Sequence, residues 1–120
     1  NTLNHDDLRA WNAIAKRLEL CATEAKQAGI VLMIDAEESW IQAGVDKLIL
    51  PLVKKYNKNR VVVAITLQLY LKERFSMYQK MIDEATKKDY FLGVKLVRGA
   101  YMEKERNRAL KLGITSPVPS

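Results

Sequence analysis

The chain has 120 residues, 48% of them hydrophobic and 28% charged, which is typical of one soluble globular domain rather than a disordered segment. No segment approaches the roughly 18 to 20 consecutive apolar residues of a membrane-spanning helix. The sequence contains one cysteine, Cys21, and one histidine, His5. An internal disulfide is therefore excluded, and zinc-hydrolase sites and Cys–His nucleophile sites lack the residues they need. The net charge of +6 is spread along the chain. A solvated basic surface is the simpler interpretation, and attraction to nucleic acid or an anionic membrane is the alternative.

A first helix is predicted up to Gly29, which suits the position just past a helix end, and Asn4 or Asp6 can cap its start. Its apolar face recurs at spacings of three and four, and comprises Leu8, Trp11, Ile14, Ala15, Leu18, Cys21, Ala22 and Ala25. Cys21 is therefore expected to be a small buried residue. The apolar run over residues 30–34 predicts a strand buried on both faces.

A second helix is predicted over residues 40–56, with Gly44 and Pro51 inside it. Proline removes a helical hydrogen bond and clashes with the preceding turn, at a cost of about 3 kcal/mol. We therefore expect a kink, or a fresh helical start, near Pro51. "YNKNR" (residues 56–60) predicts a turn, and "VVVAITLQLYL" (residues 61–71) predicts a second strand.

The pattern continues with a third helix over residues 72–89, a third strand over 90–101 and a fourth helix that ends at Gly113. The third helix is expected to turn inward its apolar residues Phe75, Tyr78, Met81, Ile82 and Ala85. Residues 114–120 contain Pro and Ser and predict an irregular tail. Strands that alternate with helices indicate an α/β fold with parallel βαβ units, from a doubly wound sheet or part of a (β/α)₈ barrel.

Polar side chains follow the apolar part of each predicted strand. Asp35, Glu37 and Glu38 follow the first strand, Thr66 and Gln68 end the second, and the third carries Lys95, Arg98 and Tyr101. Ligands of parallel α/β folds bind at the carboxyl ends of strands, so these groups predict a site there. Simpler roles stay open, because Asp35 can cap the next helix and Gln68 can be a satisfied structural amide.

Lys95 is the least ordinary of these residues. A buried ammonium is costly without a partner or an anionic ligand. Strand alternation places Lys95 on one face with Gly93 and Gly99, which leaves room for a flat ligand, and places Arg98 on the other face. The alternative is an ion pair between Lys95 and a neighbouring carboxylate. The sequence contains no dinucleotide fingerprint, phosphate-binding loop or G-x-S-x-G elbow.

Three stretches, "LMIDAEESWIQ", "LQLYLKE" and "FLGVKLVRGAYMEKERNRA", closely resemble the FAD-dependent proline dehydrogenases, in the same order. The resemblance implies consecutive βα units with parallel strands that form part of a distorted (β/α)₈ (TIM-like) barrel. It also implies FAD at the strand ends, oxidation of L-proline to Δ1-pyrroline-5-carboxylate, and transfer of electrons to a membrane quinone. "VVVAIT" departs from the Phe-Asn-Thr type of sequence in many relatives.

The resemblance also assigns roles. Asp35 resembles the aspartate that organises the substrate pocket, Gln68 the glutamine that contacts the flavin, and Lys95 the basic residue near flavin N5. The segment that lines the isoalloxazine and proline corresponds to Val97, Gly99, Ala100 and Tyr101. Asp35, Lys95 and Tyr101 are therefore the expected catalytic residues, and Gln68, Lys95, Val97, Gly99 and Ala100 the expected cofactor contacts, with no metal.

The resemblance covers only a middle portion of the family's catalytic domain, since a complete barrel takes about 250 residues. We expect a leading helix (1–29), three βα units (30–113) and a tail (114–120). The family's catalytic lysine and its pair of carboxylate-binding arginines are absent from this sequence. We therefore expect either the missing barrel segments or self-association to complete the structure. The implied location is the cytoplasm, or the periphery of the inner membrane on the matrix side in a eukaryote, with no nucleic-acid partner. The alternative is an inactive α/β binding module derived from that barrel.

Overall fold

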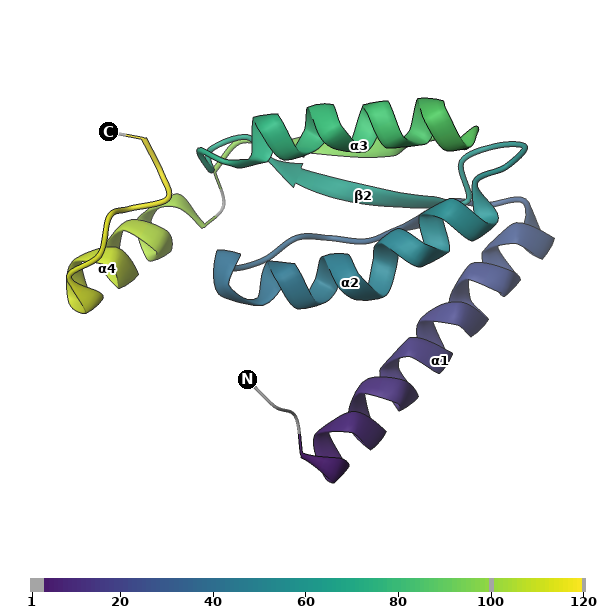
Figure 1. The fold of residues 1–120 in the computed structure, drawn as a ribbon, viewed down its shortest axis with the longest axis horizontal. Helices are drawn as coiled ribbons and strands as arrows, with labels where there is room; N and C mark the ends of the chain where they lie inside the picture. The colour runs from purple at the N-terminus through teal and green to yellow at the C-terminus, as the bar shows by residue number, and fades with distance from the viewer. Residues whose placement is uncertain (1–3, 100, 120) are drawn as a thin grey trace.

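A computed structural model describes residues 4–99 and 101–119, and over these residues helices and strands alternate as the sequence predicts. The elements in chain order are α1 (His5–Ala28), β1 (Leu32–Met33), α2 (Ser39–Tyr56), β2 (Val63–Gln68), α3 (Arg74–Lys88), β3 (Gly93–Val97) and α4 (Met102–Leu112). Figure 1 shows β2 running between α2 and α3, with α1 and α4 toward opposite sides of the view. Residues 114–119, the described part of the tail, form no helix or strand, as expected.

The three strands form one parallel sheet in the order β1-β2-β3. The register pairs Leu32 with Val63 at one end of β2 and Gln68 with Val97 at the other. Parallel pairing directs all three carboxyl ends to the same edge of the sheet. The polar residues that follow the strands therefore gather at this carboxyl edge.

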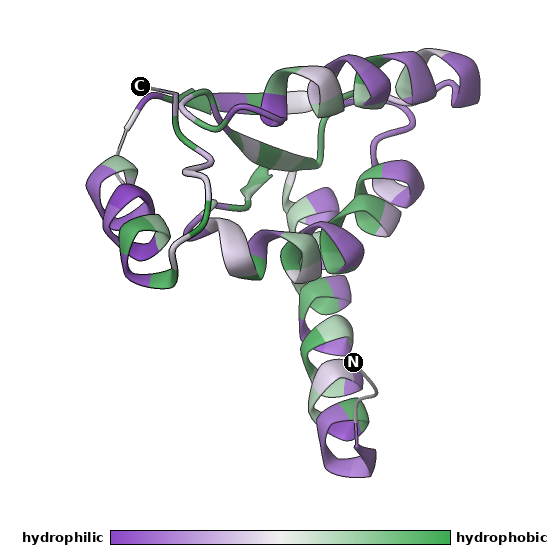
Figure 2. Ribbon diagram, turned by 60° about the vertical axis from the view of Figure 1, so that its left-hand side comes forward, coloured by the Kyte–Doolittle hydropathy of each residue, from purple (hydrophilic) through white to green (hydrophobic). Residues whose placement is uncertain are grey.

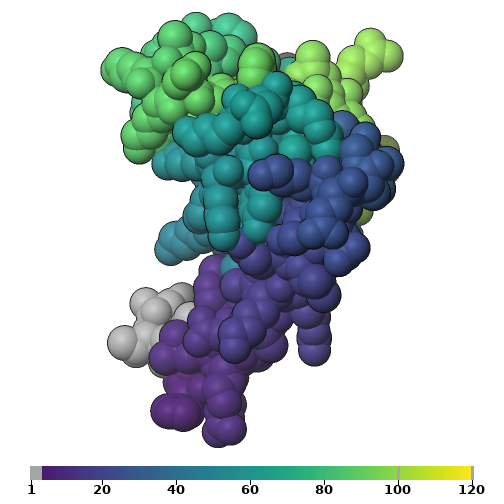
Figure 3. Space-filling view, turned by 90° about the vertical axis from the view of Figure 1, so that its right-hand side faces the viewer, coloured from purple at the N-terminus to yellow at the C-terminus, as the bar shows by residue number. Residues whose placement is uncertain are grey.

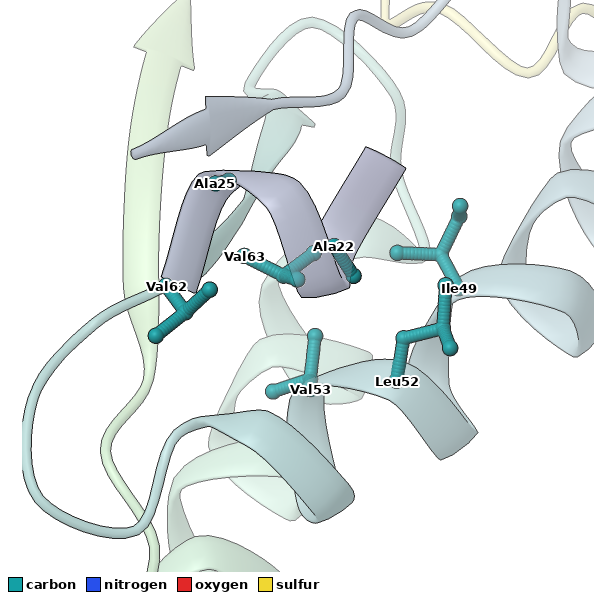
Figure 4. Close-up of a cluster of buried hydrophobic side chains, with 7 residues drawn as sticks. All are labelled: Ala22, Ala25, Ile49, Leu52, Val53, Val62 and Val63. Atoms are coloured by element: carbon teal, nitrogen blue, oxygen red, sulfur yellow. The ribbon is translucent and has the colours of Figure 1, made fainter. Parts of the chain in front are cut away.

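A compact apolar cluster joins the first two helices to the sheet (Figure 4). Its buried members are Ala22, Ala25, Ile49, Leu52, Val53, Val62 and Val63. Two alanines on α1 let this helix approach α2 and β2 closely, and Gly29 ends it in the left-handed conformation (φ 70°) that glycine adopts without strain. Cys21 is exposed, so its expected place in this core is wrong.

Asn57 holds the amino edge of the sheet together. Its side chain is fully buried, and its Oδ1 accepts hydrogen bonds of 2.9 Å from the backbone N–H groups of Val62 and Val63. Its Nδ2 donates to the carbonyls of Val63 (2.8 Å) and Phe91 (2.9 Å). One amide thus fixes the starts of β2 and β3, where the sequence predicted only a turn.

Two predicted elements differ from the structure. The strand over residues 30–34 shortens to Leu32–Met33, and Ile30 and Met33 are 60% and 44% exposed, because β1 lies at the sheet edge and pairs only with β2. The fresh helical start near Pro51 is wrong, since α2 continues through this exposed proline.

Helix α3 buries a narrower stripe than the sequence predicts. Met81 and Ala85 are buried, but Phe75 and Ile82 are 65% and 41% exposed. The amino-terminal part of α1 extends away from the sheet (Figures 2 and 3), and its Leu8 and Ile14 are also exposed. The described chain therefore leaves apolar helix surface uncovered. No helix of this described part has the length and apolarity needed to cross a membrane.

Candidate functional site

The carboxyl edge of the sheet brings an aspartate, a threonine and a lysine together. Thr66 pairs with Lys95 in the register of β2 and β3, and the Lys95 ammonium forms an ion pair with Oδ1 of Asp35. The Thr66 hydroxyl donates to the Ile34 carbonyl at 2.8 Å and lies 3.4 Å from the same Asp35 oxygen. Three strands thus contribute to one polar cluster, as the sequence predicts.

Lys95 is not a buried ammonium, so that expectation is wrong. Its side chain is 42% exposed and that of Asp35 is 71% exposed, and the alternative, an ion pair with a neighbouring carboxylate, is confirmed. The Lys95 hydrogen bond and charge hold the pKa of Asp35 below its ordinary value. The Asp35 carboxylate therefore stays ionised at neutral pH, and the ion pair lies on a face that is open in the described chain.

Gln68 is buried beside this cluster, with 1% of its surface exposed. Its Nε2 donates to the carbonyl of Glu37 and, at 2.8 Å, to the hydroxyl of Tyr70. Its Oε1 has no hydrogen-bond partner among the described residues. A buried acceptor without a donor costs about 1–3 kcal/mol, so this oxygen indicates that a donor is missing.

The segment after β3 packs partly against the tail. Val97 and Tyr101 contact the small cluster that contains Tyr70, Leu71 and Val118. Burial raises the pKa of the Tyr70 hydroxyl. Ala100, an expected cofactor contact, lies outside the described residues.

The two glycines that flank Lys95 serve different purposes. A Cβ on Gly93 would overlap the Val61 side chain, so Gly93 is required by packing within the sheet and not by a ligand. A Cβ on Gly99 would meet only Met102 Sδ, at 3.4 Å. Only Gly99 therefore matches the expectation of a glycine that leaves room beside the backbone.

A buried acid that was not predicted from the sequence, Glu105, lies at the same edge. Its two oxygens accept from the backbone N–H (2.5 Å) and hydroxyl (2.7 Å) of Ser39 at the start of α2. Next to it, Lys104 forms an ion pair with Glu38. The available signal was the position of Glu105, four residues before the buried Ala109 on the inner face of α4.

The described strands form an open wall rather than a closed pocket. A cavity of about 1030 Å³ opens between the starts of α2 and α3 and the tail, beside Gln42, Asp46 and Arg74, away from the predicted site residues. The space beside Asp35 and Thr66 amounts to about 10 Å³. Any ligand of Lys95 and Gln68 must therefore find its other contacts elsewhere.

The chain is similar to known proteins over most of its length. A family model described as proline dehydrogenase matches residues 3–120. Mitochondrial proline dehydrogenase 1 of Drosophila melanogaster is 37% identical over 103 residues, which are 86% of this chain and 15% of that protein. The counterpart from Caenorhabditis elegans is 35% identical over 118 residues, 98% of this chain and 19% of that protein. The carbapenem antibiotics biosynthesis protein CarD of Pectobacterium carotovorum is 35% identical over 104 residues, 87% of this chain and 28% of that protein.

A crystal structure supports the fold. Proline utilization A (PutA) from Bdellovibrio bacteriovorus, inactivated by N-propargylglycine, superposes with a TM-score of 0.81 at 23% identity, over 92% of this chain and 12% of that one. The prediction of parallel βα units belonging to a TIM-like barrel is thereby confirmed. The chain spans less than a third of the length of each of these relatives.

Proposed function

Because the chain belongs to the proline dehydrogenase family, we propose that it forms part of an enzyme that oxidises L-proline to Δ1-pyrroline-5-carboxylate. The family is generally flavin-dependent, and the proposed cofactor is FAD. The chemistry that bound FAD would supply is acceptance of a hydride from the substrate carbon, with a quinone as the proposed final electron acceptor. The carboxyl edge of the sheet is the proposed flavin-facing wall.

The observation that carries this proposal is the side-chain oxygen of Gln68, which has no hydrogen-bond partner in the described part of the chain. A flavin ring presents an N–H donor beside carbonyl acceptors, and a buried amide oxygen without a donor suits such an edge. The Gln68 amide is held in place from its other side by Glu37 and Tyr70, so its orientation is fixed before a ligand arrives. The residues present therefore fit a flavin.

Lys95 is the proposed electrostatic group. A fixed ammonium near the acceptor edge stabilises the negative charge that develops during hydride transfer. Asp35 orients Lys95 through the ion pair, and it belongs to the proposed substrate pocket. Val97, Gly99, Ala100 and Tyr101 are the proposed lining of the ring and the substrate.

The remaining walls of the site must come from residues beyond this part of the barrel. The proposed division is a leading helix (1–29), three βα units (30–113) and a tail (114–120). The uncovered apolar faces of α1 and α3 are consistent with further barrel segments or self-association. The Drosophila and Caenorhabditis relatives are mitochondrial. The proposed location is therefore the mitochondrial matrix in a eukaryote and the cytoplasm otherwise, with peripheral membrane contact for quinone access.

The test uses the full-length natural protein, purified and loaded with FAD. Anaerobic addition of L-proline is expected to bleach the visible flavin absorbance, and D-proline serves as the control. A protein that retains FAD but stays oxidised with L-proline contradicts the proposed activity. A folded protein that fails to retain FAD favours the alternative, an inactive α/β module that binds a partner through its exposed face.

A further inference from the structure

Helix α2 begins without a cap of its own. The residue at its N-cap position, Glu38, makes no side-chain capping bond, and the first turn contains no acid. The first backbone N–H groups of a helix need acceptors, and its amino end carries a partial positive charge. The cap is supplied instead by Glu105 of α4, 66 positions along the chain.

Glu105 is unusually well placed for this task. It is 1% exposed, and it has no salt-bridge partner among the described residues. Both of its oxygens accept hydrogen bonds from Ser39, one from the backbone N–H and one from the hydroxyl. Burial of a carboxylate is costly, and charge-assisted hydrogen bonds to a helix start offset that cost.

A second set of contacts closes the same junction. Lys104 pairs with Glu38 and lies 5.8 Å from the ring centroids of both Trp40 and Tyr101. The Arg108 guanidinium stacks 4.7 Å from the Trp40 centroid. The starts of α2 and α4 are therefore fixed to each other by the two hydrogen bonds between Ser39 and Glu105 and by an exposed cation–π cluster.

These helix starts follow the two loops that carry the proposed site. The loop before α2 contains Asp35 and the Glu37 carbonyl that orients Gln68. The loop before α4 contains Gly99 and Tyr101. Tyr70, which accepts a hydrogen bond from Gln68, has its pKa raised by burial and, to a smaller extent, by the charge of Glu105.

Resting on the proposed function, we infer that Glu105 is a positioning residue of the site. By bonding Ser39, it fixes the loop of Asp35 and Glu37 against the loop of Gly99 and Tyr101. Glu105 itself is not proposed to contact substrate or cofactor. It acts through the backbone of the two loops, which carry the side chains proposed to make those contacts. Misplacement of reacting groups by about 1 Å costs on the order of a hundredfold in rate.

The test compares Glu105→Gln with Glu103→Gln in the full-length, FAD-loaded protein. Glu103 is an exposed carboxylate in the first turn of the same helix, so its substitution removes an equal charge and leaves the bonds to Ser39 intact. The measurement is the rate constant for flavin reduction by L-proline, per bound flavin and at saturating substrate. Wild type is measured first, and its failure to react would contradict the proposed function without bearing on Glu105.

With wild type active, Glu105→Gln is expected to slow reduction by about tenfold to a hundredfold per flavin, and Glu103→Gln to leave it unchanged. A purely structural role predicts less loaded protein with a normal rate constant per flavin, and that outcome overturns the inference. If Glu105→Gln does not fold, Ser39→Ala decides, because it keeps the carboxylate and one of its two bonds. A severalfold slower reduction in Ser39→Ala supports the inference, and a wild-type rate overturns it.

Discussion

The two edges of the sheet are built in opposite ways. At the amino edge, every polar atom of the Asn57 side chain has a partner inside the described chain, and the residue is fully buried. At the carboxyl edge, the Asp35–Lys95 pair is open to solvent, and one oxygen of Gln68 has no partner among the described residues. In (β/α)₈ barrels, the amino face supports stability and the carboxyl face supports chemistry. This chain shows that division within three strands, since one edge is complete by itself and the other is not.

Substitution at the amino edge should have the largest effect on stability. Asn57→Ala removes the acceptor of the Val62 and Val63 N–H groups and one donor each from the Val63 and Phe91 carbonyls, at about 1–3 kcal/mol for each group left unsatisfied. We expect a loss of at least about 3 kcal/mol in the free energy of unfolding, measured by urea denaturation of the full-length protein. Asn59→Ala, in the same turn but exposed, is the control. Equal losses of stability in the two variants would contradict the role of the Asn57 side chain in holding the amino edge.

Substitution of the cation at the carboxyl edge should affect chemistry instead. Lys95→Met is expected to slow proline-dependent flavin reduction by about a hundredfold, the usual scale for loss of one electrostatic stabiliser. It should also let the pKa of Asp35 rise toward its ordinary value, because Lys95 is the main cause of its depression. Stopped-flow reduction measures the rate, with Arg98→Met, an exposed neighbouring cation, as the control. A similar loss in both variants would show that general charge, and not Lys95, matters.

Gln68 tests the carboxyl edge in a different way. Gln68→Met keeps the side-chain volume and removes the acceptor that has no partner among the described residues, which offsets the loss of the bonds to Glu37 and Tyr70. The free energy of unfolding should therefore fall by less than it does in Asn57→Ala. Affinity for FAD should fall about tenfold, the loss of one hydrogen bond. Titration of the apoprotein with FAD measures this. Unchanged FAD affinity, or a loss of stability comparable with Asn57→Ala, would contradict the distinction between the two edges.

The smallest expected effect lies on the surface, away from both edges. Glu84 forms ion pairs with Lys54 and Lys88, and their hydrogen bonds lower its pKa from 4.5 to about 2. A depressed folded-state pKa stabilises the protein above pH 4.5, and this contribution is lost as the pH falls from 4.5 toward 2. Glu84→Gln should therefore reduce the acid-induced fall in melting temperature over that window. Glu73 is an exposed acid at the start of the same helix, α3. Glu73→Gln is the control, and it should leave the dependence of melting temperature on pH unchanged.

Local patterns predicted the fold well where each element is covered by another. The periodicity of Ala22 and Ala25 and the β-branched run at Val62 and Val63 gave the correct core, since these residues meet inside the chain. Residues 30–34 and Phe75 were predicted to be buried and are largely exposed in the described chain. Periodicity indicates which face of an element is apolar, but it does not indicate what covers that face.

The site was predicted from strand ends and from the resemblance, and its internal contacts were not. Asp35, Thr66 and Lys95 do meet, because parallel strands deliver them to one edge. The pairing of Glu105 with Ser39 was not predicted, because it depends on how two helices separated by 66 residues approach each other. Gly93 was interpreted as space for a ligand, whereas the side chain of Val61, on the neighbouring chain segment, requires it.

The contrast between the edges is tested most directly by hydrogen–deuterium exchange of the full-length protein with and without FAD. Exchange reports local opening of the backbone, residue by residue. We predict that FAD slows exchange at residues 34–41 and 95–102, the two loops and the strand end of the carboxyl edge. Residues 57–63, at the amino edge, should already be protected without FAD and should change little. Protection gained at residues 57–63, with none at residues 34–41 and 95–102, would contradict the account.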